Sequence, residues 1–517
     1  MTDILGNLWQ GAIFACNLTN FAGCVFGYAI GVIAGAIPGI MGITALALML
    51  PFTFTMSPLF AIAAMMGCYK GAAFAGSITA ILFNIPGTPE AAATVLDGHP
   101  MAKQGQQARA LEIALWASFI GGMISNFLLI FTAPPLAKIA VHVGPAETAA
   151  LILFSLTAVI SLMGSSRVDI WKGLISVIIG LGLATIGLDP ITSTRRYGFG
   201  FTALDSGITY VVGVIAFLAF VEILDQVGKT AELKVSEDTV RAKNLPYTWA
   251  QRWADLKYCA KDVLRSSLIG SFLGAMPGIG APPAAFICYG EAKRVAGPKS
   301  RFGYGDPRGI AAPESGNNAV AASSLIPLIT LGVPGSVAAA VLGGAFMVKG
   351  MIPGPMLMHD HPQVIYGLFV LFIVADILGA FLVALPALYF MRKLLGRLNL
   401  NLLFPAVILC CAVGVYTEHF DIFAIKMLVV LGSAGYCLHK LGFALSPLVL
   451  AFILGPILER ETRTALIISG GSYGIFFTSP VACVLLILTV GALGWSIRQK
   501  IKVEKGEGSG IIFEEMG

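Results

Sequence analysis

Long apolar segments alternate with short polar ones along most of the chain. A helix that crosses a bilayer needs about 20 mainly apolar residues. Residues 1–19 predict either a short first span or a helix at the membrane interface. This pattern is typical of an all-α polytopic integral membrane protein, because helices satisfy their backbone hydrogen bonds internally. Further apolar runs of suitable length lie near 57–85, 110–132, 146–163, 169–187 and 205–227.

Two apolar stretches are broken in the middle by a proline-glycine pair. Residues 21–55 are interrupted at Pro38 and Gly39, which leaves two arms that are each shorter than the roughly 20 residues of a full span. A similar break lies at Pro277 and Gly278, 239 residues later. Each stretch therefore predicts a re-entrant hairpin, with the proline and glycine at its tip.

A second kind of break follows a complete apolar run. The run 57–85 is followed by Pro86 and Gly87, and an equivalent break occurs at Pro334 and Gly335, 248 residues later. Proline removes a backbone donor and the Pro-Gly pair ends a helix. Two broken helices at matching places in two halves predict a transport site. The alternative is that each pair only kinks a span for packing.

The matching breaks indicate one internal duplication of roughly 250 residues, not a short-period solenoid. After the first break we expect a short helix to residue 96 and then a polar loop over 97–109. The predicted organisation is a first transmembrane repeat, a cytoplasmic linker, a second transmembrane repeat and a cytoplasmic tail, over residues 1–227, 228–265, 266–495 and 496–517.

The positive charges predict which side of the membrane each loop faces. Residues 228–265 contain eight Lys and Arg, and 291–308 contain five. Cationic loops stay in the cytoplasm, which places these two segments and 97–109 inside and the cation-poor 350–362 outside. Corresponding elements then face opposite sides, so the pattern predicts inverted-topology repeats. Arg195 and Arg196 fall outside, against this trend.

Composition strengthens the membrane assignment. The chain is 57% hydrophobic and 12% charged, whereas ordinary globular domains are about 45–50% apolar and about 25% charged. The net charge of +5 is explained by lysines and arginines in cytoplasmic loops. A nucleic-acid partner is not expected, because no soluble domain carries a basic cluster. The nine cysteines are scattered without a C-x-x-C pair, which is typical of small apolar packing residues.

The breaks carry groups that suit an anionic substrate and a coupling ion. A half-helix that starts inside the membrane presents free N–H groups and a positive dipole end, which attract a carboxylate. The carbonyls that end the preceding half-helix can bind a cation such as Na⁺. Hydroxyl and amide side chains beside the breaks can bind carboxylates without a buried fixed charge. The candidate substrate-binding residues are Asn84, Pro86, Gly87, Thr88, Asn317, Asn318, Ser324, Pro334, Gly335 and Ser336.

Two charged residues lie within the apolar regions. Lys70 is inside the run 57–85, where a charge is costly and indicates function, so it is a further candidate for binding substrate. Alternatively it reaches water along its flexible stem, or an acidic residue pairs with it. Glu314 is placed at the start of a helix of the second half, where it either binds a coupling ion or caps the helix. Glu90 is open to the same two readings. Gly39 and Gly278 are further candidates for that ion.

Metalloprotease and nucleotide-binding signatures are absent from the sequence. It contains no H-E-x-x-H and no G-x-x-x-x-G-K-[ST] motif. His359, Asp360 and His361 form the tightest metal-like cluster, and a solvated turn is the simpler reading, so we expect no metal beyond Na⁺. A membrane-embedded enzyme acting on a lipid-like substrate and a passive anion channel remain alternatives to a carrier.

Long ordered motifs resemble the large membrane subunit of the tripartite tricarboxylate transporters, the TctA-like family. The motifs are the Pro-Gly-Ile hairpins at 38–40 and 277–280, ILFNIPGTPEAAATVLDGHPMAKQG at 81–105, FGYGDPRGIAAPESGNNAVAASSLIPLITLGVPG at 302–335 and PGPML at 353–357. The resemblance covers essentially the whole chain. It departs from the family at Cys68-Tyr69-Lys70, where aromatic residues and glycine are expected.

The resemblance implies a secondary carrier of the bacterial inner membrane that imports small di- or tricarboxylates on a Na⁺ or H⁺ gradient. It also implies a small four-span membrane subunit and a periplasmic solute-binding protein as partners, and no cofactor. The residues matching the family motifs are Asn84, Pro86, Gly87, Asp97, Gly98, Glu314, Asn317, Asn318, Pro334 and Gly335.

Overall fold

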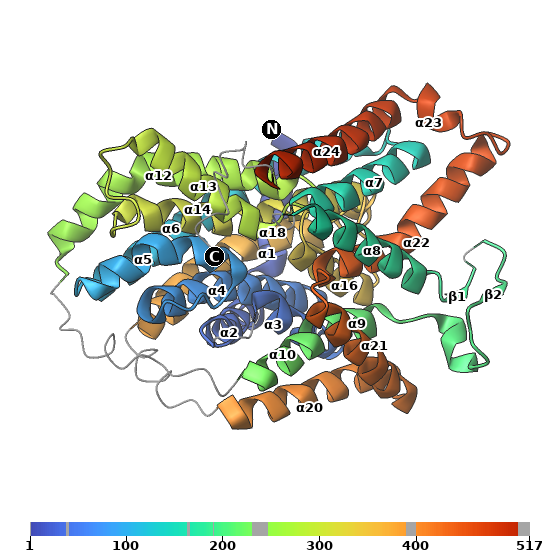
Figure 1. The fold of residues 1–517 in the computed structure, drawn as a ribbon, viewed down its shortest axis with the longest axis horizontal. Coiled ribbons are helices and arrows are strands. Elements are labelled where there is room, and N and C mark those ends of the chain that lie inside the picture. Colours follow the sequence, from blue (N-terminus) through green and yellow to red (C-terminus); the bar gives the residue numbers. More distant parts are fainter. Residues whose placement is uncertain are drawn as a thin grey trace.

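The fold is helical apart from one small β-hairpin (Figure 1). The computed structural model describes residues 2–37, 41–162, 166–189, 191–229, 247–388 and 400–504. Pro38 and Gly39 lie outside the described residues, so the tip of the first predicted hairpin stays a prediction. Within the described ranges, seven helices are long and apolar enough to cross a membrane. The predicted all-α polytopic architecture is confirmed.

The first half begins with helices that build the centre of the molecule. Of these, α2, α4 and α6 are candidate membrane spans, and α4 is buried along nearly its whole length. The elements are α1 (Thr2–Ala15), α2 (Leu18–Gly35), α3 (Gly42–Met49), η1 (Pro51–Thr55), α4 (Pro58–Phe83), η2 (Pro89–Ala91), α5 (Ala92–Lys103) and α6 (Gln107–Ala140).

The second half repeats this order of elements after the segment outside the described residues. The elements are α12 (Trp249–Ala275), α13 (Ala281–Ala296), α14 (Pro307–Ser323), α15 (Leu325–Leu331), α16 (Val337–Val348), α17 (Leu357–Asp360), α18 (Pro362–Leu378) and η5 (Gly379–Ala384), a π-helical turn that extends α18.

Both halves then continue into peripheral helices. In the first half these are α7 (Pro145–Leu162), α8 (Arg167–Ala184), the strands β1 (Gly187–Leu188) and β2 (Arg195–Arg196), η3 (Thr202–Ser206), α9 (Tyr210–Val214), η4 (Ile215–Phe220) and α10 (Val221–Lys229). In the second half they are α20 (Leu400–His419), α21 (Ile422–Lys440), α22 (Leu445–Ile468), α23 (Ile475–Thr478) and α24 (Pro480–Glu504).

Small residues let the central helices pack at close range. On α2, a side-chain carbon at Gly31 or Gly35 would collide with the backbone of Cys68 or Ala72 on α4. These glycines are spaced by four residues, so they form one stripe along the helix. Because lipid tails are as apolar as leucine side chains, membrane helices associate through such close backbone contacts rather than through the hydrophobic effect.

The second half uses the same contact. A side-chain carbon at Gly270 or Gly274 of α12 would collide with the backbone of Gly316 or Val320 of α14. The α12 glycines follow those of α2 by 239 residues, the same offset as that between the two hairpin prolines. The internal duplication seen in the sequence therefore extends to the packing of the central helices.

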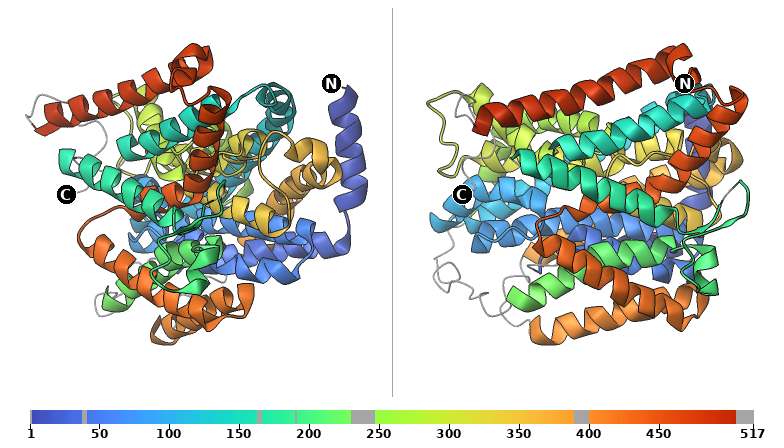
Figure 2. Two further views of the ribbon diagram at one scale, coloured as in Figure 1. Left: turned by 90° about the vertical axis from the view of Figure 1, so that its right-hand side faces the viewer. Right: turned by 45° about the vertical axis from the view of Figure 1, so that its right-hand side comes forward.

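The peripheral helices pack across the boundary between the halves. From the second half, α22 packs on α7 and α8, and α24 packs on α7, as the red and teal ribbons show (Figures 1 and 2). Conversely, α20 and α21 pack on the helix formed by α9, η4 and α10, the orange and green ribbons. Each half thus holds the peripheral helices of the other, so neither half is a separate folding unit.

Two expected boundaries compare differently with the helices. Helix α12 runs without interruption from Trp249 to Ala275, past the predicted end of the linker at residue 265, and the division into two repeats and a linker stays a prediction. The predicted polar loop over 97–109 is wrong, because α5 extends to Lys103 and α6 starts at Gln107. Asp97 is buried within α5 because its carboxylate accepts N–H groups from Gly303, Gly305 and Asp306 and the Tyr289 hydroxyl.

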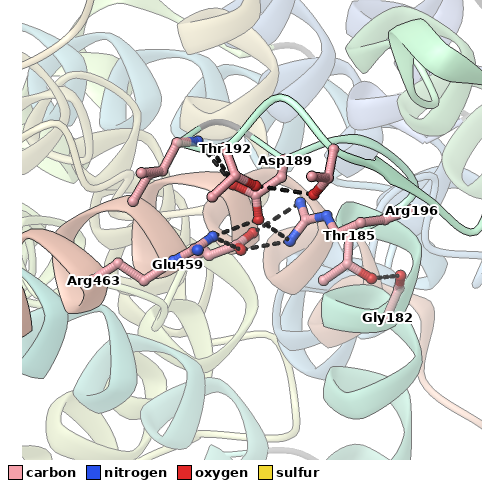
Figure 3. A network of polar contacts seen from close by, with 9 residues as sticks. Gly182, Thr185, Asp189, Thr192, Arg196, Glu459 and Arg463 are labelled. Atoms are coloured by element: carbon pink, nitrogen blue, oxygen red, sulfur yellow. Dashed lines mark hydrogen bonds and ion pairs between the residues drawn. The ribbon is translucent and has the colours of Figure 1, made fainter.

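A charged network holds the β-hairpin against α22 (Figure 3). Asp189 accepts the backbone N–H groups of Ile191 and Thr192 and a guanidinium N–H of Arg463. The Thr192 N–H, followed by Arg463, holds the pKa of this carboxyl well below its usual range. Arg196 lies 2.6 Å from Glu459.

The same hairpin contains the two arginines that oppose the charge trend. Arg195 pairs with Asp205, and Arg196 pairs with Glu459 and Asp189. The positive-inside rule counts lysines and arginines and is not a rule of net charge. The ion pairs therefore leave these two arginines against the predicted topology, which stays a prediction.

Candidate functional site

The first helix break is a compact, hydrogen-bonded turn. Helix α4 ends at Phe83, and Asn84 follows in the left-handed conformation. The backbone N–H of Gly87 then donates to the carbonyl of Gly76, which lies within α4, at 3.2 Å. Thr88 precedes the short η2 turn, which leads into α5. The break is thus folded back onto the end of the helix it interrupts.

The second break has the same backbone geometry. Helix α15 ends at Leu331, and Gly332 adopts the left-handed conformation. The N–H of Gly335 donates to the carbonyl of Ser324 at 3.1 Å, and Ser336 caps α16 by accepting the N–H of Ala339. Each of these positions lies 248 residues after its counterpart in the first break, so the two breaks are structural repeats of each other.

The glycine of each break is required by a close backbone approach. A side-chain carbon at Gly87 would collide with the carbonyl oxygen of Gly35 at the end of α2, and one at Gly335 would collide with that of Gly274 on α12. In the second half, the N–H of Gly278 also donates to the carbonyl of Gly335 at 3.1 Å. The structure therefore places the predicted hairpin tip at Pro277 and Gly278 directly against the second break.

Helix α14, which leads to the second break, is polar and buried on every face. Residues 309–323 are all buried, although they include Glu314, Asn317 and Asn318. The Asn318 amide donates to the carbonyl of Glu314 at 3.1 Å. Neither side-chain polar atom of Asn317 has a hydrogen-bond partner among the described residues.

An unpaired buried amide calls for an explanation. Leaving a buried donor or acceptor unsatisfied costs about 1–3 kcal/mol, and such a group in a native protein is explained by strain, by a functional role or by a bound water or ion. Asn317 and Ser324 are seven residues apart, so they share one face of the helical segment. The free amide of Asn317 therefore lies on the same face as Ser324. The carbonyl of Ser324 accepts the N–H of Gly335 in the second break.

Glu314 is deep inside α14, not at its start. The helix begins at Pro307 and is capped by Asp306, so the reading of Glu314 as a first-turn cap is wrong. Its two carboxylate oxygens accept hydroxyl groups of Thr94 on α5 at 2.5 Å and of Ser118 on α6 at 2.9 Å. Hydroxyl groups can donate or accept as required, so this site can hold Glu314 either charged or protonated.

Tyr69 and Glu90, neither of them among the predicted substrate-binding residues, lie between the two breaks. The Tyr69 hydroxyl on α4 lies near the Ser336 hydroxyl, and the Glu90 carboxylate is close enough to act on Tyr69 electrostatically. Glu90 also interacts electrostatically with Glu314. Glu90 is in the η2 turn after the first break. Glu90, which follows the first break, is therefore close to Tyr69, and Tyr69 is close to Ser336 of the second break.

The predicted site residues differ in their exposure. Asn84 and Pro86 are exposed, whereas Gly87 and Thr88 are buried. In the second break the residues are buried, and the Ser324 hydroxyl donates to the carbonyl of Ala321. The buried members of the second break are Ser324, Pro334, Gly335 and Ser336.

Lys70 is buried and already has partners. Its ammonium lies 2.6 Å from Asp376 on α18 and 2.9 Å from the amide oxygen of Asn126 on α6, and its side chain is only 2% exposed. Of the three sequence readings, pairing with an acid is the one the structure confirms. Sequence reasoning missed both partners, although a polar residue within a predicted span, such as Asn126, is the signal that finds them.

A cavity of about 550 Å³ reaches the second break. It lies between the α15–α16 break and the peripheral helices α8 and α22, and Gly332 and Pro334 are among its lining residues. Apolar residues form most of its wall, and Arg460 and Glu461 are charged residues that also line it. Ligand pockets commonly have volumes of about 300–1,000 Å³ and a few polar groups, so this cavity is large enough for a small organic anion.

Across the part of the chain that the structure describes, no group of three or more His, Cys, Asp and Glu residues is placed to hold a metal ion. His359 and Asp360 form an exposed hydrogen-bonded pair at 3.1 Å.

The chain is similar to known proteins over most of its length. Residues 21–450 match the tripartite tricarboxylate transporter TctA family. An Agrobacterium vitis protein described as "Uncharacterized 52.8 kDa protein in TAR-I ttuC' 3'region" is 36% identical over 504 residues, which cover 97% of this chain and 98% of that protein.

A second Agrobacterium vitis protein, "Uncharacterized protein in TAR-II ttuC' 3'region", is 37% identical over 235 residues, covering 45% of this chain and 96% of that protein. No solved structure matches the chain. Because the family match extends over both halves and both helix breaks, the chain belongs to the tripartite tricarboxylate transporter TctA family, whose members are membrane transport subunits.

Proposed function

We propose that this protein is the large membrane subunit of a secondary carrier that imports small di- or tricarboxylates, driven by a Na⁺ or H⁺ gradient. A periplasmic solute-binding protein would deliver the substrate, and a small four-span membrane subunit would complete the carrier in the bacterial inner membrane. The observation that carries the proposal is the pair of helix breaks with matching backbone geometry, one from each half.

The substrate would bind between the two breaks. Helix α16 starts at the second break, and its first N–H groups and positive dipole end favour a carboxylate. The first break, with Thr88 and η2, offers a second such end. Ser336 and Thr88 would donate hydrogen bonds, and the free amide of Asn317 would bind a substrate oxygen. Several carboxylates on one substrate can then occupy both ends together.

The coupling ion would bind near Glu314. This carboxylate is buried between α5, α6 and α14, and Glu90 interacts with it electrostatically. A cation or a proton would relieve the repulsion between two buried acids. Glu90 is also close to Tyr69, which lies near the second break. The charge of the ion would therefore change the electrostatic potential that acts on the bound substrate.

Transport would follow rocking of the central helices against the peripheral ones. Exchange of peripheral helices between the halves supports this, because α7, α8, α22 and α24 form one packed group and α9, α10, α20 and α21 form another. Such symmetry is expected of inverted repeats, in which the breaks stay at the centre while the surrounding groups move. The exposed peripheral helices would contact lipid and the small subunit.

The test is uptake into proteoliposomes that contain this subunit with its candidate partners. A panel of mono-, di- and tricarboxylates is offered with an imposed Na⁺ or H⁺ gradient. Accumulation above the outside concentration supports a carrier, whereas equilibration alone indicates a channel. Failure of every carboxylate to enter under either gradient would overturn the proposal.

A pair of asparagine variants tests the site itself. Asn317→Ala removes an amide without partners in the free protein, so stability should be unchanged or higher while uptake falls about tenfold or more, as for loss of a hydrogen bond to a charged group. Asn20→Ala is the control. Its buried amide donates to the carbonyl of Ala15 at 2.8 Å, so that variant should lose stability and keep uptake.

A further inference from the structure

Three oxygen atoms surround the ammonium of Lys70 at the centre of the molecule. They are a carboxylate oxygen of Asp376 at 2.6 Å, the amide oxygen of Asn126 at 2.9 Å and the backbone carbonyl oxygen of Phe372 at 3.4 Å. They come from α6 and α18, whereas Lys70 enters from α4. Both charged side chains are at least nine-tenths buried, so water does not solvate this pair.

The orientation of Asn126 suits a cation. Its amide nitrogen donates to the same Asp376 oxygen at 2.7 Å and to the Phe372 carbonyl at 3.3 Å. Its amide oxygen is therefore turned toward Lys70. Gly122 on the same helix lets α6 approach Asp376, because a side-chain carbon there would lie 2.9 Å from the carboxylate. The acceptor set is thus held in place by α6 and α18 and not by Lys70.

A carboxylate, an amide oxygen and a main-chain carbonyl are the donors that hard cations prefer. Among the described residues, the other ionisable side chains near the pair are Cys24 and Tyr28 of α2, and neither a thiol nor a phenol can carry a positive charge. An ammonium on a four-carbon stem is a compact point charge. It can therefore occupy a monovalent cation site while staying attached to the chain.

We infer that Asp376, Asn126 and the Phe372 carbonyl form a monovalent cation site in which the ammonium of Lys70 replaces a free Na⁺ ion. In this protein the site is permanently filled, and no Na⁺ is exchanged there. Removing the lysine side chain should leave both the oxygen atoms and the space that Na⁺ and its remaining water ligands need. The inference does not depend on the identity of the transported substrate.

The experiment measures thermal unfolding of the full-length protein in detergent, with NaCl or N-methyl-D-glucamine chloride at equal ionic strength. Lys70→Ala should be less stable than the wild type without Na⁺, because loss of one partner leaves a buried charge unpaired. Added Na⁺ should raise its melting temperature in a saturable manner, as expected for a ligand that binds only the folded state. This rise should exceed any Na⁺ response of the wild-type protein.

Two further variants make the result decisive. Lys70→Ala with Asp376→Asn removes the charge that binds the ion, so the added Na⁺ response should disappear. Lys349→Ala removes a half-buried lysine that bonds only to the backbone carbonyls of Phe54 and Met56, and it should respond like the wild type. If Lys70→Ala responds to Na⁺ no more than the wild type does, or does not fold even in high Na⁺, the inference is overturned.

Discussion

The two break glycines allow a quantitative test of how the transport region is built. In Gly335→Ala the added carbon would lie too close to three backbone atoms, namely the carbonyl oxygen of Gly274 and the Cα and carbonyl oxygen of Ser324. None of these is the end of a flexible side chain, so the break itself has to move. Gly87→Ala makes the equivalent change in the first half, against the Gly35 carbonyl and the backbone of Gly76.

The expected cost follows from the contacts that must give way. Overpacking of a filled interior typically costs about 1–3 kcal/mol. At Gly335 two hydrogen bonds are also at risk, one to Ser324 and one from Gly278, and each has a net value of about 0.5–1.5 kcal/mol. Gly335→Ala should therefore lower the free energy of unfolding by about 2–6 kcal/mol. Gly87→Ala risks one such bond and should cost less.

The assay compares both variants with Gly290→Ala in thermal unfolding and in proteoliposome uptake. Gly290 lies within α13, and a side-chain carbon there would meet no atom within 4 Å. That control should be neutral or up to about 1 kcal/mol more stable, as is usual for alanine in place of glycine inside a helix. If Gly335→Ala matches Gly290→Ala in both stability and uptake, the close approach does not shape the site and this reasoning is refuted.

Three other changes should have distinct effects. In Glu314→Gln the side chain can still form hydrogen bonds with Thr94 and Ser118. Counterflow exchange of substrate in proteoliposomes should therefore persist, while substrate accumulation driven by the ion gradient should be lost. Full accumulation would show that Glu314 does not take part in coupling. Asp97→Ala leaves three backbone N–H groups within 303–306 unpaired. Each group that water does not reach should cost about 1–3 kcal/mol. Protease should therefore cut the segment 303–306 faster in this variant than in the wild type. Because the folded-state pKa of Asp189 is below the ordinary value of about 3.9, its stabilisation of the β-hairpin should be constant above about pH 4 and weaken as the pH falls toward the lowered pKa. Pepsin cleavage of 191–206 should show that onset in the wild type, and a wild-type profile in Asp189→Asn would contradict it.

Much of the architecture could be read from the sequence because its signals are local. The apolar run at 57–85 became α4, and the proline-glycine pairs at Pro86 and Pro334 mark the observed breaks. The matching offsets of 239 and 248 residues reappeared as matching backbone contacts. Hydropathy and the missing proline N–H act within a few residues, so they do not require knowledge of the fold.

Local signals failed where a polar residue depends on a distant partner. Glu314 was expected at the start of a helix, but α14 already begins at Pro307, and the Glu314 carboxylate accepts hydroxyl groups from α5 and α6. The charges of the predicted linker also gave no sign of the helix there. Many of them lie on α12, whose other face is buried, so the number of charges does not mark where this helix begins.

The sequence by itself determined the class of the protein, its duplication, its helix breaks and its family resemblance. Only the tertiary structure decided that Lys70 pairs with Asp376, 306 residues away, that Tyr69 and Glu90 lie between the breaks, and that each half packs the other's peripheral helices. The physical reason is that a buried charge or amide needs a partner, whereas the choice of partner depends on which helices the folded chain brings together.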